Sequence, residues 1–202
     1  MPDVSLAPRS ARIHRKTAET DVTVMLALDG PDFSYENATG LGFLDHMLDL
    51  FARHGRFGLQ VACAGDLHVD DHHTAEDVSL ALGQAFREAL GDKAYVARYG
   101  HAYVPMDEAL ARAVVDLSGR AYCVIEAAFT REKVGDLSTE LVAHFWRSFV
   151  TEARLNLHAT LLYGDNAHHG VEAIFKAVAR ALRMACARDA AGDALPSTKE
   201  AL

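Results

Sequence analysis

The feature that most constrains this chain is a short pattern that occurs twice, two adjacent histidines followed after two other residues by a glutamate. The copies are His72-His73-Thr74-Ala75-Glu76 and His168-His169-Gly170-Val171-Glu172, which lie 96 positions apart. Each copy has another histidine upstream, His46 and His144. The repetition indicates two copies of one structural unit, each offering three imidazoles and one carboxylate to a metal.

The direction of the side chains predicts how such ligands are shared. If each pattern opens a helix, Glu76 lies one turn beyond both His72 and His73. Adjacent residues on a helix point about 100° apart, so one histidine of each pair is expected to bind one ion and its neighbour a second ion. A single pattern of this kind is more often a surface or capping feature, but its repetition favours two metal sites. Imidazole and carboxylate donors without thiolate suit Mn, Fe, Zn, Co or Ni.

Length and composition set the class of protein. The chain has 202 residues, of which 50% are hydrophobic, so it can bury a core as one domain or two small halves. A net charge of −8 argues against a nucleic-acid surface. Cys63, Cys123 and Cys186 lie in apolar runs and are expected to be buried free thiols. No apolar run approaches the roughly 18 residues of a membrane span, and no signal peptide is evident, which predicts a cytoplasmic protein.

Hydrophobic periodicity predicts two open α/β (α+β) halves in which helices cover one side of each sheet. In the first half, strands are expected at 22–28 and 58–64, and helices at 43–54 and from residue 72 to Gly91, with a loop over 30–39. In the second half, strands are expected at 101–104, 110–117, 121–129 and 155–163, and helices at 138–154 and from residue 168 onward. The predicted division is a tail at 1–10, halves at 11–92 and 93–187, and a second tail at 188–202.

Several segments together resemble a known family. They are Thr39-Gly40, Phe43-Leu44-Asp45-His46-Met47-Leu48, Asp71-His72-His73-Thr74-Ala75-Glu76-Asp77, the segment from His168 to Lys176, and Leu195-Pro196-Ser197-Thr198-Lys199. In combination they resemble the imidazoleglycerol-phosphate dehydratases of histidine biosynthesis, over about residues 11–199. The resemblance implies two duplicated ββαβα-like halves, similar to the second domain of ribosomal protein S5. It also implies two Mn²⁺ ions per subunit and a large octahedral homo-oligomer with sites shared between subunits. The net charge and the lack of a long apolar run predict no nucleic-acid or membrane partner.

The same resemblance implies roles for individual residues. The implied metal ligands are His46, His72, His73, Glu76, His144, His168, His169 and Glu172. The implied acid/base is Glu19, which without the resemblance would be taken for an exposed carboxylate. The implied phosphate-binding residues are Arg98, Arg120, Ser197 and Lys199, with His54 and Lys176 near the substrate. The sequence departs from the family at Glu200, which places a negative charge beside the proposed phosphate site.

Other polar residues near these segments receive structural interpretations. His14, His68, His101 and His158 lack a partner at ligand spacing and are expected not to bind metal, with His158 in the core. The expected hydrogen-bond acceptors for the ligand imidazoles are Asp45, Asp71 and Asp77.

The reaction implied by the resemblance is dehydration of D-erythro-imidazole glycerol phosphate to imidazole acetol phosphate. Two metal ions would stabilise the substrate ring as an imidazolate, which expels the hydroxyl through a diazafulvene-like intermediate. Glu19 would move the carbon-bound proton. Two alternatives use the same ligands, a dinuclear metallohydrolase and a metal-storage or metal-sensing protein, but the second gives no role to Glu19 or to the phosphate group.

Overall fold

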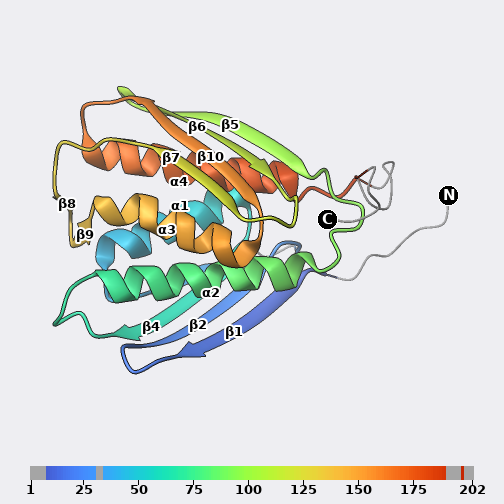
Figure 1. Cartoon of the computed structure of the whole chain (residues 1–202), viewed down its shortest axis with the longest axis horizontal. Helices are drawn as coiled ribbons and strands as arrows, with labels where there is room; N and C mark the ends of the chain where they lie inside the picture. Colours follow the sequence, from blue (N-terminus) through green and yellow to red (C-terminus); the bar gives the residue numbers. More distant parts are fainter. Residues whose placement is uncertain (1–7, 31–33, 190–196, 198–202) are drawn as a thin grey trace.

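The computed structural model describes residues 8–30, 34–189 and 197, which form three layers, with helices between two outer sheets (Figure 1). The first half consists of β1 (Ser10–Lys16), β2 (Thr20–Ala27), β3 (Tyr35–Ala38), α1 (Gly42–Gly55), β4 (Gly58–Gly65) and α2 (His72–Leu90). The second half consists of β5 (Tyr99–Met106), β6 (Ala109–Asp116), β7 (Tyr122–Glu126), β8 (Lys133–Val134), β9 (Leu137–Ser138), α3 (Glu140–Ala153), β10 (Asn156–Tyr163) and α4 (Ala167–Ala185).

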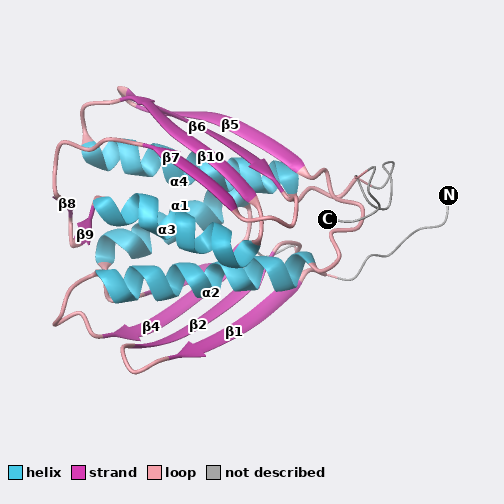
Figure 2. Ribbon diagram, viewed as in Figure 1, coloured by secondary structure: helices cyan, strands magenta, loops and turns pink. Residues whose placement is uncertain are grey.

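The two halves share one topology, which confirms the predicted α+β fold of duplicated units. The sheets have the orders β1-β2-β4-β3 and β5-β6-β10-β7, so each begins with a hairpin and ends with a parallel strand pair. The helices lie on the inner face of each sheet (Figure 2). The division predicted between residues 92 and 93 falls between α2 and β5 and remains a prediction, as do the tail boundaries.

The helical layer joins the halves, because each helix packs on a helix of the other half. Helix α2 lies against α3, and α1 lies against α4. The fully buried rings of Phe51, Phe86, Trp146 and Phe149 fill the space between them. At Gly83 the backbones of α2 and α3 approach so closely that an added Cβ would lie 2.3 Å from the carbonyl oxygen of Phe149. This packing brings side chains on a helix of one half into contact with side chains on a helix of the other half.

The prediction of a loop over residues 30–39 was wrong in part, because residues 35–38 form β3. This short edge strand is largely exposed and is held by its parallel backbone ladder with β4, so it shows no apolar alternation. The helix expected from residue 138 begins at Glu140, because Leu137 and Ser138 pair with Val134 and Lys133 in the β8–β9 ribbon. The strand expected at 121–129 ends at Glu126.

The cysteines are free thiols, as predicted, but only Cys186 is fully buried. Cys63 in β4 and Cys123 in β7, the edge strand of the second sheet, are partly exposed. Burial raises the pKa of Cys63 and Cys123 to about 11 and that of Cys186 to about 12, so the thiols are protonated near neutral pH. Among the described helices, none is long and apolar enough to cross a membrane.

Candidate functional site

Both repeated histidine patterns open a helix, as predicted, and equivalent polar residues fix where each helix begins. The side chain of Asp70 accepts a hydrogen bond from the backbone N–H of His72, at 2.9 Å. The side chain of Asn166 accepts one from the N–H of His168, also at 2.9 Å. Such acceptors satisfy backbone donors that a helix leaves unpaired at its first turn. The histidine pairs therefore lie in the first turn of the helix in both halves.

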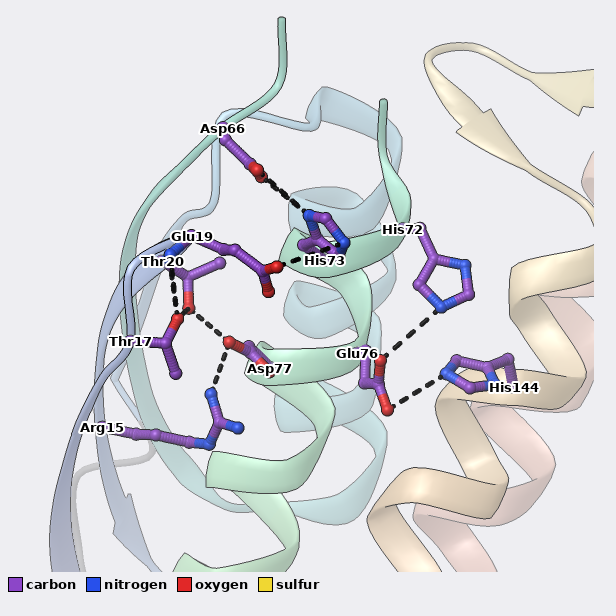
Figure 3. A network of polar contacts seen from close by, with 10 residues as sticks. All are labelled: Arg15, Thr17, Glu19, Thr20, Asp66, His72, His73, Glu76, Asp77 and His144. Carbon is purple, nitrogen blue, oxygen red and sulfur yellow. Dashed lines mark hydrogen bonds and ion pairs between the residues drawn. The ribbon is translucent and has the colours of Figure 1, made fainter. Parts of the chain in front are cut away.

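The first cluster of donor atoms lies between α2 and α3 and consists of His72, Glu76 and His144 (Figure 3). The carboxylate of Glu76 lies 3.5 Å from the Nε2 atom of His72 and 3.5 Å from that of His144. The Nε2 atom of His144 is buried and makes no hydrogen bond within the described part of the chain. A buried polar atom normally has a partner, so this nitrogen suits a bound cation. We call this set the α2–α3 cluster.

The second cluster lies between α1 and α4 and consists of His46, His168 and Glu172. The carboxylate of Glu172 lies 3.2 Å from Nε2 of His168 and 3.7 Å from Nε2 of His46. Burial alone would raise the pKa of Glu172, but the hydrogen bond and charge of Lys176, with the two histidines, bring that pKa below its ordinary value. The carboxylate is thus negative near neutral pH. We call this set the α1–α4 cluster.

Each cluster joins the two halves, which differs from the expectation that each half supplies its own metal. The upstream histidine of one half meets the helix-opening pattern of the other half, because α1 packs on α4 and α3 packs on α2. In both clusters, the donor atoms lie within 4.8 Å of one another. Three nitrogen or oxygen atoms at this separation can bind one ion and leave positions for further ligands.

The second histidine of each pair points away from both clusters. The ring centroids of His72 and His73 are 6.1 Å apart and those of His168 and His169 are 6.0 Å apart, and the two members of each pair contact different carboxylates. This divergence follows from the angle between adjacent residues on a helix. It leaves His73 and His169 available to a different ion from their neighbours.

Carboxylates hold these two outward histidines. The Nδ1 atom of His73 lies 3.0 Å from Asp66, and its Nε2 atom lies 3.7 Å from Glu19. The Nδ1 atom of His169 lies 2.7 Å from Glu108. The hydrogen bonds that His73 donates to Asp66 and His169 donates to Glu108 raise the pKa of the two histidines. The bond to His169, helped by backbone N–H donors, lowers the pKa of Glu108 to about 2.

A polar network holds Glu19 beside His73 (Figure 3). Thr17 accepts hydrogen bonds from the backbone N–H groups of Glu19 and Thr20, at 3.1 and 3.0 Å, which shapes the turn between β1 and β2. The buried carboxylate of Asp77 accepts from Thr20 and pairs with Arg15, so the hairpin is fixed against α2. The side chain of Glu19 is 51% exposed and can reach a bound molecule.

The prediction that Asp45, Asp71 and Asp77 orient the ligand imidazoles was wrong. Asp45 accepts from Thr39, Asp71 accepts from Ser138 and Lys133, and Asp77 bonds as described above. These aspartates precede or follow a ligand by one position, so they face different directions from it. The carboxylates that do bond to imidazoles, Asp66 and Glu108, come from turns. The sequence clue to them is the placement of acidic residues directly after β4 and directly before β6.

Lys176 and His54 lie near the α1–α4 cluster. Lys176 donates a hydrogen bond to Glu172. Burial, followed by the charges of Lys176 and Arg180, lowers the pKa of His54, so its imidazole is neutral near pH 7. Both side chains are therefore close to one candidate metal site.

Arg98 lies far from this cluster. It pairs with Asp116 at the end of β6, and its backbone N–H bonds to Ala185 at the other end of α4 from His168. The 17 residue steps from His168 to Ala185 correspond to roughly 25 Å of helix. Arg120 lies in the loop that follows β6, and Ser197 is partly buried. Lys199 and Glu200 lie outside the described residues.

The remaining histidines belong to neither cluster. His14 pairs with Asp21 at 2.7 Å on the exposed face of the first sheet. The prediction that His158 lies in the core was wrong, because Leu157 and Ala159 face the helices and His158 faces outward, near the ring of Tyr122. His68 and His101 are exposed.

Comparison with known proteins agrees with this architecture. The family model of imidazoleglycerol-phosphate dehydratase matches residues 39–182. The imidazoleglycerol-phosphate dehydratase of Salinibacter ruber is 63% identical over 202 residues, 100% of both chains. The crystal structure of the Staphylococcus aureus enzyme has a TM-score of 0.80 at 42% identity, covering 89% of this chain and 99% of that one. The Pyrococcus furiosus structure has a TM-score of 0.81 at 33% identity, covering 94% of this chain and 100% of that one. The chain therefore belongs to the imidazoleglycerol-phosphate dehydratase family.

Proposed function

We propose that the α2–α3 cluster and the α1–α4 cluster each bind one Mn²⁺ ion, giving two ions per subunit. The observation that carries this proposal is the convergence of three nitrogen and oxygen donors in each cluster, with the buried Nε2 atom of His144 left without a hydrogen bond within the described part of the chain. Neither cluster contains a thiolate. Histidine with carboxylate fits manganese or a related divalent ion better than a structural zinc site.

His73 and His169 complete the ligand sets of neighbouring subunits in this proposal. Each has an Nε2 atom that makes no hydrogen bond to the described residues and belongs to neither cluster of its own chain, while a carboxylate bonds to its Nδ1 atom. With them, each ion receives four protein ligands and keeps positions for the substrate. The proposed assembly is a large octahedral homo-oligomer.

The chain is a dehydratase of histidine biosynthesis, and the proposed reaction is conversion of D-erythro-imidazole glycerol phosphate to imidazole acetol phosphate and water. When bound, the metal ions supply Lewis acids that stabilise negative charge on the substrate's imidazole ring. The cytoplasm is the expected compartment, since the pathway consumes soluble metabolites.

Glu19 is the proposed base and acid. Its carboxylate lies 3.7 Å from the Nε2 atom of His73, so a substrate ring bound at that histidine is next to Glu19. There the carboxylate can remove the proton from carbon and return a proton to carbon as the enol becomes the ketone. The contacts of Thr20 and Arg15 with Asp77 keep the turn, and thus Glu19, in place.

The phosphate of the substrate requires cations from more than one subunit. Lys176 and His54 lie beside the α1–α4 cluster, whereas Arg98 lies near the far end of α4. A small substrate cannot span a whole helix, so in this proposal Arg98 of one chain binds the phosphate of a substrate held at a metal site of another chain. Arg120 and Ser197 are assigned to the same phosphate group from the sequence resemblance. Lys199 is assigned to the same group from the sequence resemblance alone. This division supports an oligomeric active site.

The test of the proposed function is product analysis. Manganese-loaded protein is incubated with imidazole glycerol phosphate, and the ketone and inorganic phosphate are both measured. We expect the ketone to form without phosphate release. Phosphate release would instead indicate a dinuclear hydrolase, and metal binding without any turnover would indicate storage or sensing.

A further inference from the structure

The turn between β5 and β6 occupies the same place in the second half as the turn between β1 and β2 in the first. Each turn ends with a glutamate directly before the next strand, Glu19 before Thr20 and Glu108 before Ala109. Each glutamate also lies beside the second histidine of a helix-opening pair, His73 or His169. The duplication therefore produced two equivalent carboxylates beside two equivalent imidazoles.

The two carboxylates make different contacts. In the first half Asp66, which follows β4, bonds to Nδ1 of His73 at 3.0 Å, and Glu19 stays near Nε2. In the second half the residue after β10 that corresponds to Asp66 is Asp165, which is exposed and makes no hydrogen bond to the described residues. Glu108 bonds to Nδ1 of His169 instead, at 2.7 Å. The carboxylate that orients the imidazole thus comes from a different loop in each half.

We propose that Glu108 is the positioning residue of His169 and does for it what Asp66 does for His73. The inference rests on the proposed function, because it takes His169 as a metal ligand. A carboxylate on Nδ1 holds the ring proton there and leaves the lone pair of Nε2 for a metal. The other carboxylate oxygen of Glu108 accepts the backbone N–H of Asn166 at 2.9 Å, so one side chain fixes both the ring and the start of α4.

This arrangement also explains why only one of the two equivalent glutamates is available for proton transfer. Glu108 is engaged at both oxygens, by His169 and by Asn166. Glu19 does not orient a histidine ring in this way, because Asp66 already accepts the hydrogen bond from Nδ1 of His73. The chemistry of the site is therefore asymmetric although the fold is duplicated.

The variant Glu108→Gln tests this role through manganese affinity. The glutamine oxygen can still accept the N–H of Asn166, but its NH₂ group would donate to Nδ1 of His169 and move the ring proton to Nε2. We expect one of the two ions to bind about 10- to 100-fold more weakly, as for other losses of an imidazole's orienting partner. The thermal stability of the metal-free protein should stay close to wild type. Glu88→Gln is the matched control, since it makes the same charge change on the exposed side of α2, outside both clusters, and should bind both ions as wild type does.

A double-variant comparison separates positioning from a structural role. If Glu108 acts through His169, the His169→Ala and Glu108→Gln losses in affinity are not additive, and the double variant binds manganese as weakly as His169→Ala alone. Additive losses, or unchanged affinity in Glu108→Gln protein while wild type binds two ions, would overturn this inference and leave the proposed function intact. Wild-type protein that binds no manganese would overturn both.

Discussion

Glu19→Gln protein is expected to retain both manganese ions and to lose about 10²- to 10⁴-fold in kcat, the usual contribution of a positioned acid/base group. Glutamine has nearly the shape of glutamate but cannot accept the proton. The side chain is half exposed and lies in a turn fixed by Thr17, so folding should not change. The measurements are kcat, KM and manganese content. A near-normal kcat would mean that another group moves the proton.

Glu88→Gln is a suitable control for that experiment. Glu88 lies on the exposed side of α2, where it accepts a hydrogen bond from Gln84 at 3.0 Å, outside both clusters. The same charge change at this position is expected to leave kcat, KM and metal content unchanged. A comparable loss of turnover in Glu88→Gln protein would point to a general effect of charge.

The second large effect concerns the partition of ligands between the ions. His72→Ala and His144→Ala each remove a donor from the α2–α3 cluster, so each variant, and the double variant, should retain one manganese per chain at limiting metal. His72→Ala combined with His46→Ala removes a donor from each cluster and should retain none. Each ligand loss is expected to weaken its ion by about 10-fold or more. Mass spectrometry of the metal content measures this directly.

His14→Ala is the control, because His14 is exposed and, among the described residues, bonds to Asp21. It should keep both ions. If the double variant at His72 and His144 lost as much metal as the double variant at His72 and His46, the assignment of ligands to the two clusters would be wrong.

Much of the fold could be predicted from the sequence because its strongest signals are local. The spacing of Leu44, Met47, Leu48 and Phe51 is that of a buried helical face, and all four are buried in α1. Strand β3 could not be predicted in this way, since an exposed edge strand carries no hydrophobic period. This segment forms a strand because it pairs with β4, and that pairing joins residues far apart in the sequence.

The residues of the candidate site could be selected from the sequence, but their grouping could not. The divergence of His72 and His73 follows from helix geometry and was predicted. The meeting of His46 with Glu172 depends on the packing of α1 against α4, which no local pattern records. The same limit applies to Asp66 and Glu108, because the contact of a turn with a helix appears only after the sheets and helices assemble.

The most direct test of the account is a manganese titration of the metal-free protein. Bound manganese per chain, assembly size and the initial rate of ketone formation are measured on the same samples. The account predicts no turnover without metal, a rise in rate that follows occupancy up to two ions per chain, and growth of the assembly as His73 and His169 join neighbouring subunits. Full turnover by protein that contains no metal would contradict it.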